Sequence, residues 1–238
     1  MRIKKQGTRK LGIIGKIKVG ETIEKGGRKI PTSLDYFRAT SNVAQYESIF
    51  TKMYPKNNLL PVVFGTDDDE FNTNHRYEIR DHTGKVYSFG DGEDYYVSSK
   101  EGFRKVESEL IESKYGGLQS FLDKTEAYLS NSRVKAQWKE VLTLRFVIPG
   151  MPILGAWELR TMAAKSSIDQ ILGNYDLAKN INGGTIKGVP FFLRVQKVKS
   201  NRVLDYQRVY PVISLDQVLT EQARASELLS GGNLKLID

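Results

Sequence analysis

The residues of this sequence that could do catalytic chemistry gather in one acidic stretch, residues 61–100, which holds nine carboxylates and both histidines of the chain. Hard cations such as Mg²⁺ bind several carboxylate oxygens at once. Consecutive acids, however, point in diverging directions, and their spacing matches no calcium-binding loop. We therefore expect solvated loops here, and a metal-dependent nuclease remains an alternative. The acids are Asp67, Asp68, Asp69, Glu70, Glu78, Asp81, Asp91, Glu93 and Asp94.

The two histidines, His75 and His82, do not suit a catalytic pair. They are seven residues apart across the start of an expected hairpin, and an odd separation along a strand places side chains on opposite faces. A chain with no cysteine also excludes thiolate zinc sites, iron–sulfur clusters and cysteine nucleophiles. Nucleophile-elbow, Walker and dinucleotide-binding motifs do not occur. We therefore expect a protein that is not an enzyme and uses no metal and no cofactor.

The net charge of +8 is unevenly distributed along the chain. Residues 1–30 hold ten basic and two acidic side chains, and residues 133–202 hold twelve basic and four acidic ones. Residues 61–100 hold four basic and nine acidic side chains. This pattern favours an anionic partner that contacts two basic segments. The acidic stretch between them is the better surface for a basic protein partner.

A nucleic-acid interface is predicted in two places. An N-terminal arm over residues 2–18 suits sequence-independent contacts with phosphates. A hairpin over residues 186–213 interleaves aromatic and basic side chains, which could stack bases, although cross-strand packing with extended arginines is the alternative interpretation. The candidate residues are Arg2, Lys4, Lys5, Arg9, Lys10, Lys16 and Lys18 in the arm, and Arg194, Lys197, Lys199, Arg202, Tyr206, Arg208 and Tyr210 in the hairpin.

Strands and helices of ordinary length are expected to position these residues. Residues 21–31, with Gly26 and Gly27, are expected to form a mobile loop, and Ser200-Asn201 a turn. Ser214-Leu-Asp-Gln217 is a capping-box pattern that predicts a last helix. The expected strands cover residues 11–19, 59–64, 76–80, 85–89, 138–148, 154–161, 186–199 and 202–213, and the expected helices cover residues 42–54, 101–114, 118–130, a segment between Ser167 and Asn182, and 215–229.

The order of elements in the C-terminal half, ββαββα, predicts antiparallel sheets with helices packed on them, an α+β protein. The expected organisation is a basic arm with the first strand (1–30), an N-terminal α+β half (31–132) and a C-terminal α+β half (133–238), or one continuous domain in place of the two halves. No apolar run approaches the roughly 20 residues that span a bilayer, so we expect a cytoplasmic protein without a membrane partner.

Three groups of short motifs follow one another in an order that resembles a known family. The chain is similar to the phage recombination directionality factor-like family over most of its length. The motifs are Pro31-Thr-Ser-Leu-Asp-Tyr-Phe-Arg38 with Val62-Val-Phe64; Tyr77-Glu-Ile-Arg-Asp81 with Gly84 and Gly90-Asp-Gly92; and Gly155-Ala-Trp-Glu-Leu-Arg-Thr161 with Ser167-Ile168, Gly183-Gly184, Val189-Pro190 and Leu193. Most of the matching residues, Trp157 among them, are expected to serve folding.

That family includes the protein that switches a phage serine integrase from integration to excision. The resemblance implies a non-enzymatic nucleic-acid-binding accessory protein of a phage or mobile element, which acts in site-specific recombination by binding the integrase–DNA complex. It favours DNA over RNA as the nucleic acid. The alternatives are a single-stranded DNA-binding replication protein, a CRISPR-type RNA-binding backbone subunit and a virion protein whose basic arm contacts the packaged genome.

Overall fold

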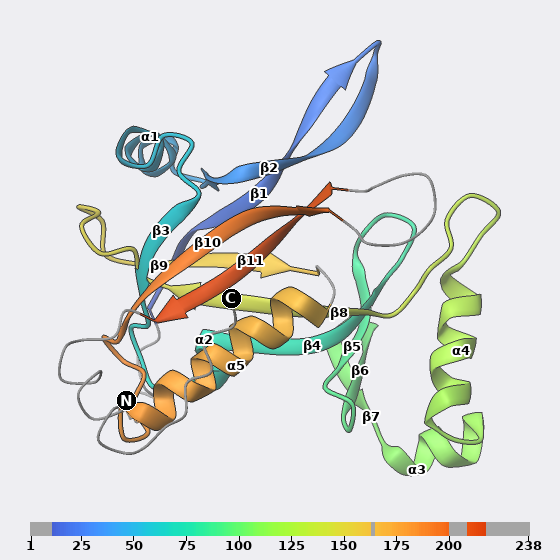
Figure 1. Ribbon diagram of the computed structural model, residues 1–238. Coiled ribbons are helices and arrows are strands. Elements are labelled where there is room, and N and C mark those ends of the chain that lie inside the picture. The colour runs from blue at the N-terminus through green and yellow to red at the C-terminus, as the bar shows by residue number, and fades with distance from the viewer. Residues whose placement is uncertain (1–10, 163–164, 200–208, 218–238) are drawn as a thin grey trace, which may run out of the picture. The chain divides into compact units, whose positions relative to one another are not determined.

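The computed structural model describes residues 11–162, 165–199 and 209–217. Within them the chain forms eleven strands in two sheets and five α-helices, which confirms the α+β class. Two compact units are described separately below (Figure 1). The first comprises Met1–Asn72, Leu144–Leu159 and Lys165–Asp238, and the second comprises Thr73–Thr143 and Arg160–Ala164. Among the described residues, no helix is long and apolar enough to cross a membrane.

In the first unit, four strands follow one another in the order β2-β1-β9-β8. The strands β1 (Ile13–Lys25) and β2 (Arg28–Thr40) form a long antiparallel hairpin. β1 also pairs in parallel with β9 (Ala156–Thr161), whose other neighbour is β8 (Lys139–Phe146). The division between the units falls within β8 and β9, so each of these strands contributes to both.

The first unit also contains a three-stranded antiparallel sheet. The central strand is β10 (Pro190–Lys199), and it pairs with β3 (Leu59–Val63) on one side and β11 (Val209–Gln217) on the other. The predicted pairing of the last two strands is therefore confirmed. Ser200 and Asn201, where the turn between these strands is predicted, lie outside the described residues, and the described register ends with Lys199 opposite Val209.

The helices of this unit are α1 (Ala44–Met53), the short α2 (Asp69–Asn72) and α5 (Lys165–Ile181). Apolar side chains recur every three or four residues along α5 and are fully buried, as an amphipathic helix requires. Tyr175 of α5 contacts Phe64 edge to face at 4.9 Å between ring centroids. Trp157 of β9 is also buried, with its ring centroid 5.8 Å from that of Phe50 of α1. This burial confirms its expected place in the core.

The second unit contains an antiparallel meander of four strands, with helices packed on one face. Its strands follow in the order β8-β4-β5-β6-β7, and its helical segment runs through a π-helical turn, η1. Tyr95, Ile111 and Phe121 form the buried centre between sheet and helices. The elements are β4 (Thr73–Arg80), β5 (Val86–Gly90), β6 (Tyr95–Ser99), β7 (Gly102–Val106), α3 (Ser108–Leu110), η1 (Ile111–Tyr115) and α4 (Leu118–Leu129).

The mobile loop expected at residues 21–31 is wrong, since these residues belong to the β1–β2 hairpin. Lys25 pairs directly with Arg28, and the two glycines between them have φ of +58° and +70°. Positive φ at both central residues is what the commonest two-residue hairpin turn requires, and glycine adopts it without steric cost. The Gly-Gly pair is therefore the turn of a continuous ribbon.

Two predicted helices are also corrected. Within 101–114, residues 102–106 form β7 and only the part from Ser108 is helical, because pairing with β6 uses the backbone groups of the first half. Ser214–Gln217 continue β11, with Ile213 and Leu215 both buried. Backbone pairing with β10, from Arg194↔Ser214 to Phe191↔Gln217, makes this stretch a strand and overrides the local capping pattern. Residues 218–229 lie outside the described residues.

Candidate nucleic-acid interface

Eight of the fourteen residues predicted to bind nucleic acid lie outside the described part of the chain. Lys16 and Lys18 of the predicted arm lie on β1, and both are exposed. The residues that lie outside the described part of the chain are Arg2, Lys4, Lys5, Arg9, Lys10, Arg202, Tyr206 and Arg208.

The β10–β11 pair places the other predicted residues, and two of its cations have acidic partners. Arg194 Nε lies 3.0 Å from Asp216 Oδ2, and Lys197 Nζ lies 3.4 Å from Asp35 Oδ2. The backbone of Tyr210 lies opposite Val198 in the register. The positive charge of Arg194 and Lys197 is thus partly neutralised within the first unit.

A larger exposed basic surface lies on the β1–β2 hairpin, which we call the basic ribbon. The pairing of β1 with β9 ends at Ile17. Beyond it, from Gly20↔Ser33 to Lys25↔Arg28, β1 pairs with β2 alone among the described strands (Figure 1). Its side chains from Thr22 to Pro31 are exposed to solvent. The basic residues of the ribbon are Lys16, Lys18, Lys25, Arg28, Lys29 and Arg38.

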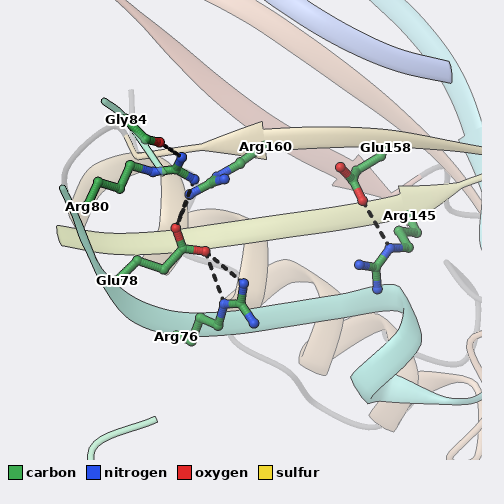
Figure 2. A network of polar contacts seen from close by, with 7 residues as sticks. All are labelled: Arg76, Glu78, Arg80, Gly84, Arg145, Glu158 and Arg160. Carbon is green, nitrogen blue, oxygen red and sulfur yellow. Dashed lines mark hydrogen bonds and ion pairs between the residues drawn. The ribbon is translucent and has the colours of Figure 1, made fainter. Parts of the chain in front are cut away.

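The most organised basic cluster is in the second unit, and we call it the Glu78 network (Figure 2). Arg76 donates from Nε and Nη2 to Glu78 Oε1, over 3.1 and 2.9 Å. Arg80 donates from Nη2 to Glu78 Oε2 over 3.1 Å, and Arg160 donates from its Nη2 to the same oxygen. One carboxylate therefore holds three guanidinium groups, and the cluster keeps a surplus of two positive charges.

Burial differs sharply between the centre and the edge of this network. The Glu78 side chain is only 2% exposed, whereas those of Arg76, Arg80 and Arg160 are 31%, 35% and 33% exposed. Burial alone would raise the pKa of Glu78, but the hydrogen bond from Arg76 and the positive charges of all three arginines outweigh it. The pKa of Glu78 therefore lies below its ordinary value, and the carboxylate stays ionised.

Strand geometry explains how the network forms. Arg76, Glu78 and Arg80 alternate along β4, so their side chains share one face of the sheet. Arg160 comes from β9, and β8 lies between these two strands in the sheet order. Sequence reasoning missed these residues as a site, although the Arg-x-Glu-x-Arg alternation on an expected strand was a usable signal. Two of the quoted family motifs meet here, since one contains Glu78 and Arg80 and the other contains Arg160.

A second pair in Figure 2 shows a balanced arrangement for comparison. In the first unit, Arg145 Nε lies 3.3 Å from Glu158 Oε2, and Arg145 Nη1 donates to the carbonyl oxygen of Phe71 over 3.1 Å. One arginine and one glutamate leave no surplus charge. This pair is therefore neutral as a whole, in contrast to the three arginines on Glu78.

The acids of residues 61–100 serve mainly to hold loops. Asp67 accepts hydrogen bonds from the backbone N–H groups of Lys187 and Ile186 and from the hydroxyl of Thr185, and these bonds hold its pKa below the ordinary value. Asp69 pairs with Lys179. In the described part of the chain, no group of three or more histidines and acids could hold a metal ion.

The histidines are separated in the same way. His75 Nε2 lies 2.7 Å from Glu140 Oε1, in the second unit. His82 lies in the turn between β4 and β5, where Asp81 accepts hydrogen bonds from the backbone N–H groups of Thr83 and Lys85. Neither histidine shares a site with the other.

A comparison with protein families gives one match. Residues 14–217 match the model of the Gp3-like family, described as recombination directionality factor-like. No curated protein and no solved structure matches the chain.

Proposed function

Because the chain belongs to the recombination directionality factor-like family, we propose that it is a non-enzymatic accessory protein of phage-type site-specific recombination, which binds the DNA of a recombinase–DNA complex. In that complex it would also dock on the recombinase, a serine integrase, and favour one synaptic arrangement. The observation that supports DNA binding best is the surplus of half-exposed arginines in the Glu78 network.

The chemistry of arginine makes this network suitable for phosphate. Each guanidinium has five N–H donors in a planar fork that matches the oxygens of a phosphate. Hydrogen bonds to Glu78 hold the three groups in place and leave further N–H donors of each directed elsewhere. Since these side chains are already ordered, less conformational entropy is lost when a phosphate binds.

The basic ribbon would add contacts of a less specific kind. Exposed lysines and arginines neutralise phosphates and release counterions, whatever the base sequence. A two-stranded ribbon also has the dimensions to enter the major groove of duplex DNA. We therefore expect the ribbon to contribute general affinity and the Glu78 network to contribute fixed contacts with the backbone.

The test is a fluorescence-anisotropy titration of the full chain with a short labelled duplex at about 50 and about 200 mM salt. The variant is Arg80→Gln with Arg160→Gln, which leaves Arg76 to pair with Glu78. We expect about tenfold weaker binding and a slope of log K against log salt that is smaller by about 2, one for each lost phosphate contact.

The matched control is Arg104→Gln, which removes an exposed arginine that forms an ion pair with the exposed Glu101. This control should leave the affinity and the salt slope near their wild-type values. Failure of the wild-type chain to bind nucleic acid at low salt would overturn the proposal. An unchanged salt slope for the folded double variant would also overturn it.

A further inference from the structure

One face of the second unit's sheet combines the Glu78 network with a row of aromatic rings. The register pairs Glu78 with Phe89, Phe89 with Tyr96, and Tyr96 with Lys105, so these four side chains form one row across β4, β5, β6 and β7. Phe103 stands on the same face as Lys105, two residues away along β7. We call this surface the aromatic face.

The opposite face of the same strands is the one that packs against the helices. Tyr95 and Val106 are paired with each other there and belong to the buried cluster of the second unit. Tyr95 is 3% exposed, whereas Phe103 is 45% exposed on the aromatic face. Phe89 and Tyr96 are half-buried. The aromatic face therefore presents its rings partly to solvent.

The rings of this face are close together and are bordered by positive charge. Phe89 stacks on Tyr96 with centroids 5.0 Å apart and an interplanar angle of 17°, and Phe103 meets Phe89 edge to face at 4.9 Å. The guanidinium of Arg76 lies over the Phe89 ring, 4.2 Å from its centroid. At the far end of the row, Lys105 Nζ lies 2.7 Å from Asp94 Oδ1.

We propose that the aromatic face binds single-stranded nucleic acid, with unpaired bases stacked on Tyr96 and Phe103 and phosphates held by the arginines of the Glu78 network. This inference rests on the proposed function, because it uses the same arginine–phosphate contacts. Four strands span about 14 Å at a spacing of about 4.8 Å, which suits the two or three bases that such sheets stack.

The combination of groups favours a single strand over a duplex. In a duplex the bases stack on one another, and rings on a sheet surface cannot reach their faces. Every base has a π-face, so stacking on aromatic side chains tolerates any sequence. The sequence predicts such a surface on the hairpin over 186–213, and here a second one is formed by four other strands.

The test compares oligothymidylate with a duplex of the same length in anisotropy titrations of the full chain. The variant is Phe103→Ala, whose ring lies on a half-exposed strand position. We expect oligothymidylate binding to weaken about tenfold, the usual scale for one lost stack, while duplex binding stays within twofold. The control is Tyr128→Ala, which removes an aromatic ring that is 74% exposed on α4, and should change neither affinity.

A second measurement does not depend on the folding of a variant. Photo-crosslinking of wild-type protein to a bromouracil-substituted oligonucleotide, mapped by mass spectrometry, should give adducts on the peptides that contain Tyr96 and Phe103. Adducts that are confined to other segments would overturn the aromatic face.

The outcomes separate this inference from the proposed function. Phe103→Ala could leave the affinity for oligothymidylate unchanged or lower the affinities for both ligands equally. If the Arg80/Arg160 variant loses duplex binding at the same time, the aromatic face does not bind single strands, and the proposal of DNA binding stands. If wild-type protein binds neither ligand, both are wrong.

Discussion

The basic ribbon of the first unit and the Glu78 network of the second unit carry the same kind of charge in different surroundings. The lysines of the ribbon are exposed along a two-stranded hairpin, and its Arg38 lies 3.8 Å from Glu21. The arginines of the network are instead bound to a buried carboxylate. Fixing a side chain in one conformation costs conformational entropy. The arginines of the network lose this entropy when the protein folds, whereas the lysines of the ribbon lose it only when a ligand binds. The ribbon is therefore suited to adaptable contacts and the network to fixed ones.

The largest effect that would test this difference is expected from Glu78→Ala. Removal of the carboxylate leaves three arginines side by side without their partner, so the free energy of unfolding should fall by about 3 kcal/mol. Urea denaturation followed by circular dichroism measures it. The control, Glu101→Gln, removes an exposed partner of Arg104 and should change stability by less than about 0.5 kcal/mol. Equal, small effects for both variants would show that the network is no more fixed than the surface.

A smaller effect is expected from acid. The pKa of Glu78 is lower in the folded state than its ordinary value, so its contribution to stability is complete above the unfolded pKa of about 4.3 and is lost as the pH falls through the folded pKa. The difference in unfolding free energy between wild type and Glu78→Gln should therefore shrink below about pH 4.3. Urea titrations at neutral and acidic pH measure this difference. A gap that stays constant with pH would contradict an ionised, arginine-bound Glu78.

The smallest effect on stability is expected from the ribbon. Replacement of Lys25, Arg28 and Lys29 by glutamine removes exposed charges near the turn, so the unfolding free energy should change by less than about 0.5 kcal/mol. The salt slope of duplex binding should nevertheless fall by about 3, if each side chain neutralises one phosphate. Anisotropy at several salt concentrations gives the slope. A loss of stability without a change in slope would assign the ribbon a structural role.

The elements that the sequence predicted well are those with regular burial. The helix between Ser167 and Asn182 and the strands over 138–148 and 154–161 have strong apolar periodicity, and the structure has α5, β8 and β9 there. Two of the errors, at residues 21–31 and 101–106, fell where few side chains are buried. Every residue of β7 except Val106 is exposed, so no period of two marks the strand, and spaced apolar residues suggested a helix. Its identity as a strand depends on pairing with β6.

The candidate site also has one part that local sequence predicts and one part that only the strand order produces. The alternation of Arg76, Glu78 and Arg80 is local and can be recognised in an expected strand. Arg160 is 82 residues from Glu78 along the chain and joins the network through the β9-β8-β4 order, which no local pattern predicts. The aromatic face likewise depends on the register of four strands. A shift of one residue in that register would turn Phe89 or Tyr96 to the face that packs against helices.

The sequence by itself determined the α+β class, the surplus of positive charge and the motifs that indicate the family, because composition and local periodicity are properties of neighbouring residues. Only the tertiary structure decided which charges are compensated and which are not. Arg194 and Lys197 acquire acidic partners, whereas Arg76, Arg80 and Arg160 share one carboxylate. The physical reason is that electrostatic partners are selected by distance in space, and strand order and register set those distances across long stretches of chain.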